Sequence, residues 1–301
     1  MEKEKVISEV VPIVPTPFHE NEEIDKEALQ RLIDFSVNGN IKAVCLPAYA
    51  SEFYKLTDEE RLQVVRIAVE YAKGRVQVVA QSNHPSLRNA ARLAKANVDS
   101  GADVISVAVP RIFGMPEDSI LEYLSGFLKS VPNTPVLIQD FNPGGASISV
   151  NMITRLMNEH QNFKYLKLEE PLCGPKFEAI IESTHGNIGL MEGWGGLYMM
   201  ELITIGIAGV MPGLAVSDIL QKIFRLRKSG DNDKAYDLFE KVMPQIFFSL
   251  QNMELFHYME KELLIARGVL TNSVVRSARY IPDDATKKYV KELNQRILQL
   301  V

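Results

Sequence analysis

Cysteine is scarce in this chain, with only Cys45 and Cys173 among its 301 residues. Two cysteines so far apart provide no disulfide framework, which disfavours a small secreted scaffold. No apolar run approaches the length of a membrane span. The charged start at residues 1–5 leads into a short apolar stretch broken by prolines, without a signal-peptide core. We therefore expect a cytoplasmic protein with no membrane partner.

Basic residues are also too few to suggest a polyanionic partner. The 33 Lys and Arg are outnumbered by 38 Asp and Glu, so the net charge is -5 at pH 7 and we expect no binding of nucleic acid. The five histidines stand far apart, and none falls in an HExxH or Cys/His spacing. The glycines of Gly193-Trp194-Gly195-Gly196 suit a tight turn better than a phosphate cradle. We predict neither a metal nor a cofactor.

Strand and helix patterns alternate from residue 10 to about residue 216. Apolar runs predict eight strands, at residues 10–15, 43–46, 76–80, 104–107, 136–138, 165–168, 188–191 and 209–211. Amphipathic patterns predict helices at 24–38, 57–72, 86–100, 117–130, 175–184 and 197–205, the second opened by a capping box of Thr57 and Glu60. Successive βα units predict an α/β fold, a (β/α)8 TIM barrel. The rival open sheet would carry a glycine fingerprint after its first strand, where this chain has Pro15-Thr16-Pro17.

The sequence after residue 216 is helical throughout, with its clearest breaks at residues 230–231 and 271–273. We therefore expect a catalytic barrel domain over residues 1–228 and a C-terminal helical domain over 229–301, packed on the barrel or on another subunit. Apolar residues such as Met199, Met200 and Phe247-Phe248 fit either a core or a subunit interface.

The predicted strand at 165–168 places Lys167 and Glu169 on one face, because side chains alternate along a strand. A buried lysine is costly unless it is paired or neutral. A nucleophilic lysine needs a pKa near neutrality instead of about 10.4, a change of roughly 4 kcal/mol that burial can supply but a neighbouring carboxylate opposes. From these residues alone, a structural ion pair and a catalytic amine both remain open.

In a (β/α)8 barrel, chemistry gathers at the carboxyl ends of the strands. The polar residues there are Tyr49, Ser51 and Glu52 after the second strand, Gln81, Ser82, Asn83 and His84 after the third, Gln139 and Asp140 after the fifth, Lys167 and Glu169 on the sixth, and Glu192 with Gly193 after the seventh. Because Asn83-His84-Pro85 also fits a turn with a helix cap, a structural role for His84 stays open beside a substrate contact.

Three motifs, in this order, resemble those of the dihydrodipicolinate synthase/N-acetylneuraminate lyase family. They are Pro15-Thr16-Pro17-Phe18 with Ile24-Asp25, the segment 51–61 (SEFYKLTDEER), and Tyr165-Leu166-Lys167. The resemblance covers nearly the whole chain and implies a homotetramer or homodimer that binds a small 2-keto acid as a Schiff base on Lys167. It also implies substrate contacts from Ala50, Ser51, His84, Gln139, Gly193 and Val210.

Departures from the family pattern narrow the expected reaction. The family's glycine-threonine-threonine-glycine-glutamate loop is replaced by Ala48-Tyr49-Ala50-Ser51-Glu52, and Gln139 stands in place of its proton-shuttling tyrosine. The arginine that the synthases use for a second substrate is missing from Asn142-Pro143-Gly144-Gly145. Gln139-Asp140 and Lys167-Leu168-Glu169 instead resemble the 2-keto-3-deoxy sugar-acid dehydratases, such as L-2-keto-3-deoxyarabonate dehydratase.

We therefore predict a Schiff-base-forming hydro-lyase whose catalytic residues are Lys167 and Glu169. The iminium on the lysine acidifies the substrate C3 proton, and the glutamate removes it before the C4 hydroxyl leaves. An aldolase or a 4-hydroxy-tetrahydrodipicolinate synthase-like enzyme is the alternative within the family. A non-catalytic 2-keto acid binding protein is the alternative from another class. Side chains around residues 83, 112–115 and 194 would set the substrate's length and stereochemistry.

Overall fold

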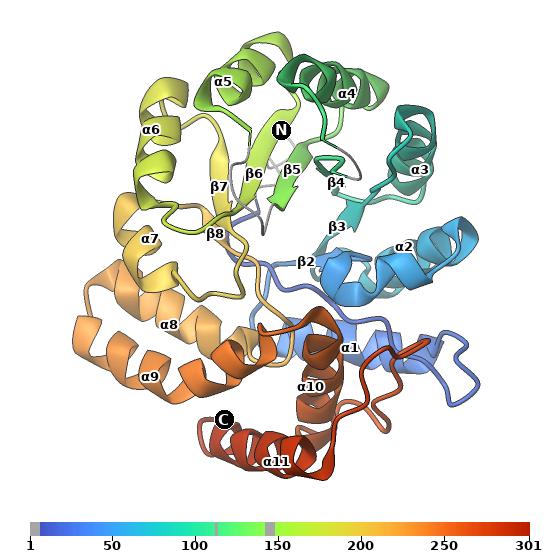
Figure 1. Ribbon diagram of the computed structural model, residues 1–301, viewed down its shortest axis with the longest axis vertical. Coiled ribbons are helices and arrows are strands. Elements are labelled where there is room, and N and C mark those ends of the chain that lie inside the picture. Colours follow the sequence, from blue (N-terminus) through green and yellow to red (C-terminus); the bar gives the residue numbers. More distant parts are fainter. Residues whose placement is uncertain (1–6, 112–113, 142–147) are drawn as a thin grey trace.

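Eight parallel strands surrounded by helices form the core of the computed structural model, which describes residues 7–111, 114–141 and 148–301 (Figure 1). The strands are β1 (Glu9–Val10), β2 (Ala43–Leu46), β3 (Gln77–Gln81), β4 (Val104–Ala108), β5 (Val136–Phe141), β6 (Phe163–Glu169), β7 (Gly189–Glu192) and β8 (Gly209–Val210). Each strand from β2 to β7 pairs with the next one along the chain, and β8 also pairs with β1, all in parallel. This order is that of the expected (β/α)8 barrel.

The barrel closes through Ile13 and not through a continuous first strand. Ile13 forms single bridges to Cys45 on β2 and to Gly213 after β8. The amide of Cys45 donates to the carbonyl of Pro12 at 2.9 Å, and Val14 donates to the carbonyl of Cys45 at 3.0 Å. The prediction of one strand over residues 10–15 was therefore wrong in extent, because prolines have no N–H to donate to a ladder and interrupt it.

The barrel helices are α1 (Lys26–Asn38), α2 (Asp58–Ala72), α3 (Leu87–Asp99), α4 (Glu117–Ser130), α5 (Val150–Glu159), α6 (Gly174–Thr184), α7 (Met199–Ile205) and α8 (Ser217–Ser229). The capping box of Thr57 and Glu60 is confirmed at the start of α2, with both of its hydrogen bonds present. Helix α5, which sequence periodicity left undelimited, is capped by Ser149, whose side chain accepts from Met152 N. The helices cover the outside of the strand ring (Figure 1).

The barrel interior changes from apolar to polar toward the carboxyl ends of the strands. Deeper positions hold an apolar cluster that includes Val79, Leu137 and Tyr165. Two residues further along the same strands, the inward positions are Gln81, Gln139 and Lys167. Since side chains alternate with a period of two, this step places polar groups directly above a dry core.

Three helices follow the barrel: α9 (Asn232–Ser249), α10 (Met253–Ala266) and α11 (Asp284–Leu298). They lie together beside α8 and α1, at the lower edge of Figure 1. Buried Val242, Leu263 and Ile297 from these helices belong to the same hydrophobic cluster as the barrel helices. The division at residue 228 stays a proposal, since α8 ends at Ser229 and packs against α9.

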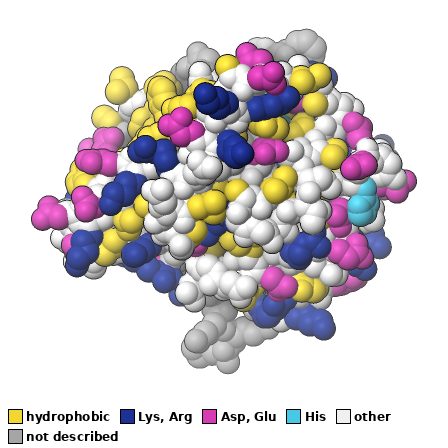
Figure 2. All heavy atoms as spheres, turned by 90° about the horizontal axis from the view of Figure 1, so that it is seen from below, with side chains coloured by type: hydrophobic (Ala, Val, Ile, Leu, Met, Phe, Trp, Pro, Cys, Tyr) yellow, Lys and Arg dark blue, Asp and Glu magenta, His cyan; other side chains and the backbone are white. Residues whose placement is uncertain are grey.

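On the face shown in Figure 2, acidic and basic side chains of the described residues are interspersed and do not form a patch of one sign. Among the helices that the structure describes, none combines the length and apolar character needed to cross a membrane.

Candidate active site

A cavity of about 280 Å³ opens at the carboxyl ends of the strands and contains both residues of the predicted catalytic pair. Its lining comes from the barrel strands, the loops that follow them and the segment joining α9 to α10. The described lining residues are Ile13, Ala48, Tyr49, Ala50, Gln139, Phe141, Lys167, Glu169, Gly193, Trp194, Gly195, Met211, Pro212, Gly213, Ser249, Leu250, Gln251, Asn252, Met253 and Phe256. Within this lining, Lys167 and Glu169 are the residues whose side chains ordinarily carry a full charge at neutral pH.

Lys167 and Glu169 lie side by side on β6 and face into this cavity. The Lys167 Nζ atom is 3.0 Å from Glu169 Oε1, and each residue is only 6% exposed. Both belong to the inward-facing set of the strand, as the alternation predicted. The pair is therefore nearly dry but in contact with a ligand-sized space, which is the setting in which proton transfer between an amine and a carboxylate can support chemistry.

Two buried amides hold the Glu169 carboxylate in place. Gln139, which is paired in register with Lys167 on the neighbouring strand, donates from Nε2 to Glu169 Oε1 at 2.6 Å. Gln81 Nε2 in turn donates to Gln139 Oε1. An ionised carboxylate can only accept, so it orients the amide of Gln139, and that amide orients the next one. Both hydrogen bonds therefore run in the same direction, from Gln81 to Gln139 to Glu169, and together they fix the position of the carboxylate and the orientation of each amide.

The side chain of Glu169 packs directly against the backbone of Gly193 on β7's outgoing loop. A Cβ atom at residue 193 would lie 2.2 Å from Glu169 Cγ, a distance that no side chain tolerates. The absence of a side chain at Gly193 therefore leaves the space that the Glu169 side chain occupies. The prediction that this residue contacts substrate stays a prediction, although it does line the cavity.

A second buried carboxylate, Glu192, holds the loop that covers this side of the cavity. Its Oε1 accepts from the amide of Trp194 at 3.0 Å and its Oε2 from the amide of Gly196 at 2.8 Å. Complete burial raises the pKa of Glu192 to about 7, although the backbone donors and the charge of Lys167 oppose the rise. The sequence singled out the Glu192-Gly193 pair, but not the role of the carboxylate in holding the loop.

The other predicted contact residues divide into those that line the cavity and those that lie behind it. Ala50 lines it, on the short 3-10 helix η1 (Tyr49–Ser51). Ser51 lies behind, where its hydroxyl donates to the carbonyl of Val14 at 2.6 Å and anchors the loop. Val210 is fully buried, and the three residues that follow it, Met211, Pro212 and Gly213, border the cavity.

His84 lies at a second cavity, of about 200 Å³, which it shares with Phe53, Arg111 and Tyr49. Its Nδ1 atom accepts from the amide of Ser86 at 2.9 Å, at the turn that opens α3. This contact supports the interpretation of Asn83-His84-Pro85 as a turn, and a substrate contact from His84 stays a prediction.

Asp140, the second member of the Gln-Asp pair, points away from the catalytic cavity. It is fully buried, 2.5 Å from Arg111 Nη2, and accepts from the amide of Ile148 at 2.6 Å. The carboxylate thus joins the ends of β4 and β5 and the start of the segment leading to α5. The stretch Asn142-Pro143-Gly144-Gly145 and residues 112 and 113, which the sequence interpretation used, lie outside the described residues.

The C-terminal helices contribute part of the site that the sequence did not predict. Residues 249–253 and Phe256 border the cavity from the turn between α9 and α10. A buried ion pair ties this turn to the barrel, because Lys261 Nζ on α10 lies 2.6 Å from Glu52 Oε1 and both side chains are 1% exposed. The one available signal was Glu52 itself, a charged residue at a strand end with no predicted partner.

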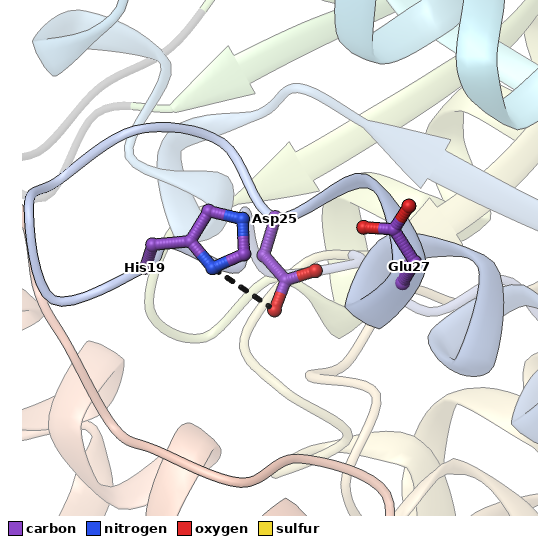
Figure 3. Close-up of side chains that lie close together, drawn as sticks. All are labelled: His19, Asp25 and Glu27. Carbon is purple, nitrogen blue, oxygen red and sulfur yellow. Dashed lines mark ion pairs between the residues drawn. The ribbon is translucent and has the colours of Figure 1, made fainter.

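The described residues include one group with metal-binding side chains, namely His19, Asp25 and Glu27 (Figure 3). His19 Nδ1 lies 3.7 Å from Asp25 Oδ2, and Asp25 Oδ1 caps α1 by accepting from Ala28 N at 2.8 Å. Two of the three residues are exposed. The positive end of a helix disfavours a cation, so we assign the group to helix capping.

Comparisons with known proteins agree with the geometry. A sequence model of the dihydrodipicolinate synthetase family matches residues 6–296. L-2-keto-3-deoxyarabonate dehydratase of Azospirillum brasilense is 26% identical over 79% of this chain and 78% of the relative. A 4-hydroxy-tetrahydrodipicolinate synthase of Lachnoclostridium phytofermentans is also 26% identical, over 77% of this chain and 79% of the relative.

Solved structures share the fold at lower identity. Dihydrodipicolinate synthase from Rhodopseudomonas palustris gives a TM-score of 0.88 at 24% identity, over 96% of this chain and 97% of that chain. YagE, a prophage protein of E. coli K12 belonging to the dihydrodipicolinic acid synthase family, gives 0.88 at 19% identity, over 98% of this chain and 99% of that chain. The barrel, the placement of the lysine on its sixth strand and the family match over residues 6–296 lead to one conclusion: the chain belongs to the dihydrodipicolinate synthetase family of lyases.

Proposed function

We propose that this protein is a hydro-lyase that dehydrates a small 2-keto-3-deoxy sugar acid through an imine on Lys167. The observation that carries the proposal is the buried pair of Lys167 and Glu169 at 3.0 Å, facing a cavity of about 280 Å³. This volume is just below the range of roughly 300–1,000 Å³ that is typical of small-molecule sites, which suits a short acid.

The first step forms the imine. The Lys167 ammonium gives a proton to the Glu169 carboxylate or to solvent, and the free amine attacks the C2 carbonyl of the substrate. The carbinolamine then loses its hydroxyl as water, with the proton supplied by Glu169 or by solvent, and leaves a protonated imine on the lysine and a carboxylate on the glutamate. The 3.0 Å separation allows both transfers without a change in the chain.

The second step removes water from the substrate. The iminium withdraws electrons from C3, so the Glu169 carboxylate can take a C3 proton and generate an enamine. The C4 hydroxyl takes up a proton and leaves as water as the enamine electrons form a C3–C4 double bond. Addition of water at C2 then breaks the imine, returns the free lysine and releases the dehydrated 2-keto acid. Gln139 and Gln81 keep the carboxylate oriented during these transfers.

The substrate carboxylate would lie against the η1 turn at Ala50. The described cavity lining contains no arginine and no cation besides Lys167. Backbone amides are therefore the donors that we assign to the carboxylate, in place of the threonine hydroxyls that the sequence lacks. The similarity to the Azospirillum brasilense dehydratase supports the choice of reaction, although the synthases are similar to the chain at comparable identity.

Borohydride trapping tests the imine. The folded protein would be incubated with pyruvate or a 2-keto-3-deoxy acid, reduced, digested and analysed by mass spectrometry. We expect the reduced adduct on Lys167, and its loss in the variant Lys167→Arg. Lys164 is the matched control, since it lies on the same strand but is exposed: Lys164→Arg should label as fully as the parent. An unlabelled Lys167 in folded protein would contradict the proposal.

Product analysis separates this reaction from its alternatives. A dehydratase gives a product lighter by one water, an aldolase releases pyruvate, and a synthase consumes pyruvate together with an aldehyde. A binding protein would be stabilised by a 2-keto acid in a thermal unfolding assay from pH 6 to 9 without converting it. A panel of 2-keto-3-deoxy acids of different length and stereochemistry, with products identified by mass, decides among the four.

We further propose that the protein acts in the cytoplasm as a homotetramer or homodimer, as the family resemblance implies. Sedimentation velocity over a range of protein concentrations tests the assembly, and a single monomeric species at micromolar concentration would contradict it.

A further inference from the structure

Tyr49 lies next to the catalytic pair, on the loop that follows β2. It lines the same cavity as Lys167 and Glu169. Its ring packs between those of Phe53, with centroids 4.9 Å apart, and Phe141, with centroids 5.2 Å apart. Because Phe141 on β5 is paired in register with Glu169 on β6, the aromatic contact holds the tyrosine beside the carboxylate. Two aromatic neighbours leave this ring little freedom to turn away.

The hydroxyl group of Tyr49 is available to a ligand. Other tyrosines near the site are committed: Tyr54 bonds to His257 at 3.0 Å, and Tyr123 donates to the carbonyl of His84 at 2.6 Å. Among the described residues, the Tyr49 hydroxyl has no hydrogen-bond partner, and its oxygen is not among the buried polar atoms that lack one. A phenol without a hydrogen-bond partner in the described part of the chain can donate to a bound molecule.

A second proton donor would let the C4–O bond break without returning the C3 proton from Glu169. While Glu169 holds that proton, the C4 oxygen leaves as water only if another group protonates it. The hydroxyl of Ser249 already donates to Ile246 O at 2.8 Å, and Gln251 Nε2 to Phe248 O at 3.0 Å. In the described lining, Tyr49 is the titratable side chain that remains beside Lys167 and Glu169.

We infer that Tyr49 is a further catalytic residue, whose phenol gives its proton to the C4 hydroxyl as that group departs. This inference rests on the proposed dehydration. The C4–O bond breaks as the phenolic O–H bond breaks, so water leaves and a phenolate remains. The proton that Glu169 took from C3 then returns the tyrosine to its neutral form, through the water released. No oxidant or other reactant is needed, and one water is lost in each turnover.

The electrostatics of the site agree with this role. Burial and the nearby Glu169 carboxylate both raise the pKa of Tyr49. The phenol is therefore protonated throughout the neutral range and serves as an acid, whereas a phenolate there would be a base.

The test separates the C3 step from the C4 step in the variant Tyr49→Phe. Three quantities are measured: borohydride trapping with pyruvate, exchange of the C3 protons of pyruvate for deuterium in D2O, and the rate of dehydration of the 2-keto-3-deoxy acid that the parent converts. We expect trapping and exchange within about threefold of the parent, and dehydration slower by roughly 10²-fold or more, the usual scale for a general acid. A 4-chloro-2-keto acid, whose leaving group needs no proton, should be converted by the variant at nearly the parent rate.

Controls keep the outcomes distinct. Tyr236→Phe, on the exposed side of α9, should behave as the parent in all assays. Tyr49→Met also removes the hydroxyl and replaces Tyr49→Phe in the same assays if that variant does not fold. Unchanged dehydration by a folded variant, or a loss that extends equally to the chloro acid and to C3 exchange, would overturn the role of Tyr49 and leave the proposed function intact. Failure of the parent to dehydrate any acid in the panel would overturn both.

Discussion

Replacing Glu169 with glutamine removes a base while preserving the shape of the site. In Glu169→Gln, the carbonyl oxygen of the new amide can still accept from Gln139 Nε2, which now donates to Glu169 Oε1 at 2.6 Å. The amide cannot take a proton near neutral pH. The Lys167 amine, whose Nζ lies 3.0 Å from the original carboxylate, is itself unchanged in the variant. We therefore expect the imine to form and the C3 proton to stay in place.

The size of the expected loss in kcat follows from how few groups could replace Glu169 as the base. Glu169 is the carboxylate in the described cavity lining. Glu192 is fully buried behind the loop and occupied by two amides. With no other carboxylate in the described cavity lining, the variant should lose the full contribution of a general base, roughly 10²-fold to 10⁴-fold in kcat, or about 3–5 kcal/mol of transition-state stabilisation.

Borohydride trapping and steady-state kinetics measure the two effects separately. The expected result is an adduct on Lys167 with parent-like yield and a kcat at least about 10²-fold lower. Glu170→Gln is the matched control, because Glu170 is the next residue, pairs with Lys176 at 3.0 Å and does not line the cavity. Parent-like turnover in Glu169→Gln would remove this residue from the mechanism, and loss of the adduct would mean that the carboxylate serves imine formation instead.

Three further predictions concern the support of the site. Gly193→Ala should displace the Glu169 side chain, since the new Cβ would lie 2.2 Å from its Cγ, and misplacement on the scale of 1 Å costs roughly 10²-fold in rate; parent-like kcat would contradict this contact. Lys261→Met leaves Glu52 buried with Lys55 at 3.2 Å as its remaining ion-pair partner, so urea unfolding should show a loss of about 3 kcal/mol in the free energy of unfolding. The double variant with Glu52→Gln should largely recover this loss. Equal stabilities of the single and double variants would argue against the pair. Because the pKa of Glu192 rises from 4.5 to about 7 on folding, the folded state binds the extra proton, and the parent loses stability as pH rises from about 4.5 to 7. The unfolding free energy of Glu192→Gln relative to the parent should therefore increase by about 3 kcal/mol between pH 4.5 and pH 8, and a difference that does not change with pH would refute the shift.

Periodicity and turn residues were sufficient for most of the fold. The helix predicted at 117–130 matches α4, and the capping box of Thr57 and Glu60 forms as predicted. Prediction failed where backbone donors were missing, since the first strand shrinks to Glu9–Val10 with bridges at Ile13. Alternation of side chains was also enough to place Lys167 and Glu169 on one face, because residues two apart share a face in any extended strand.

What the sequence by itself determined was therefore local: which segments are strands or helices, which residues share a face, and which polar groups stand at strand ends. Only the tertiary structure decided which strand ends meet. It brought Gln139 and Gln81 into a chain that ends on Glu169, sent Asp140 away from the cavity, and placed the turn between α9 and α10 over the mouth. These relations join residues from different strands and helices. They depend on barrel closure and on buried pairs such as Lys261 with Glu52, whose two members lie 209 positions apart, too far for any periodic pattern to connect them.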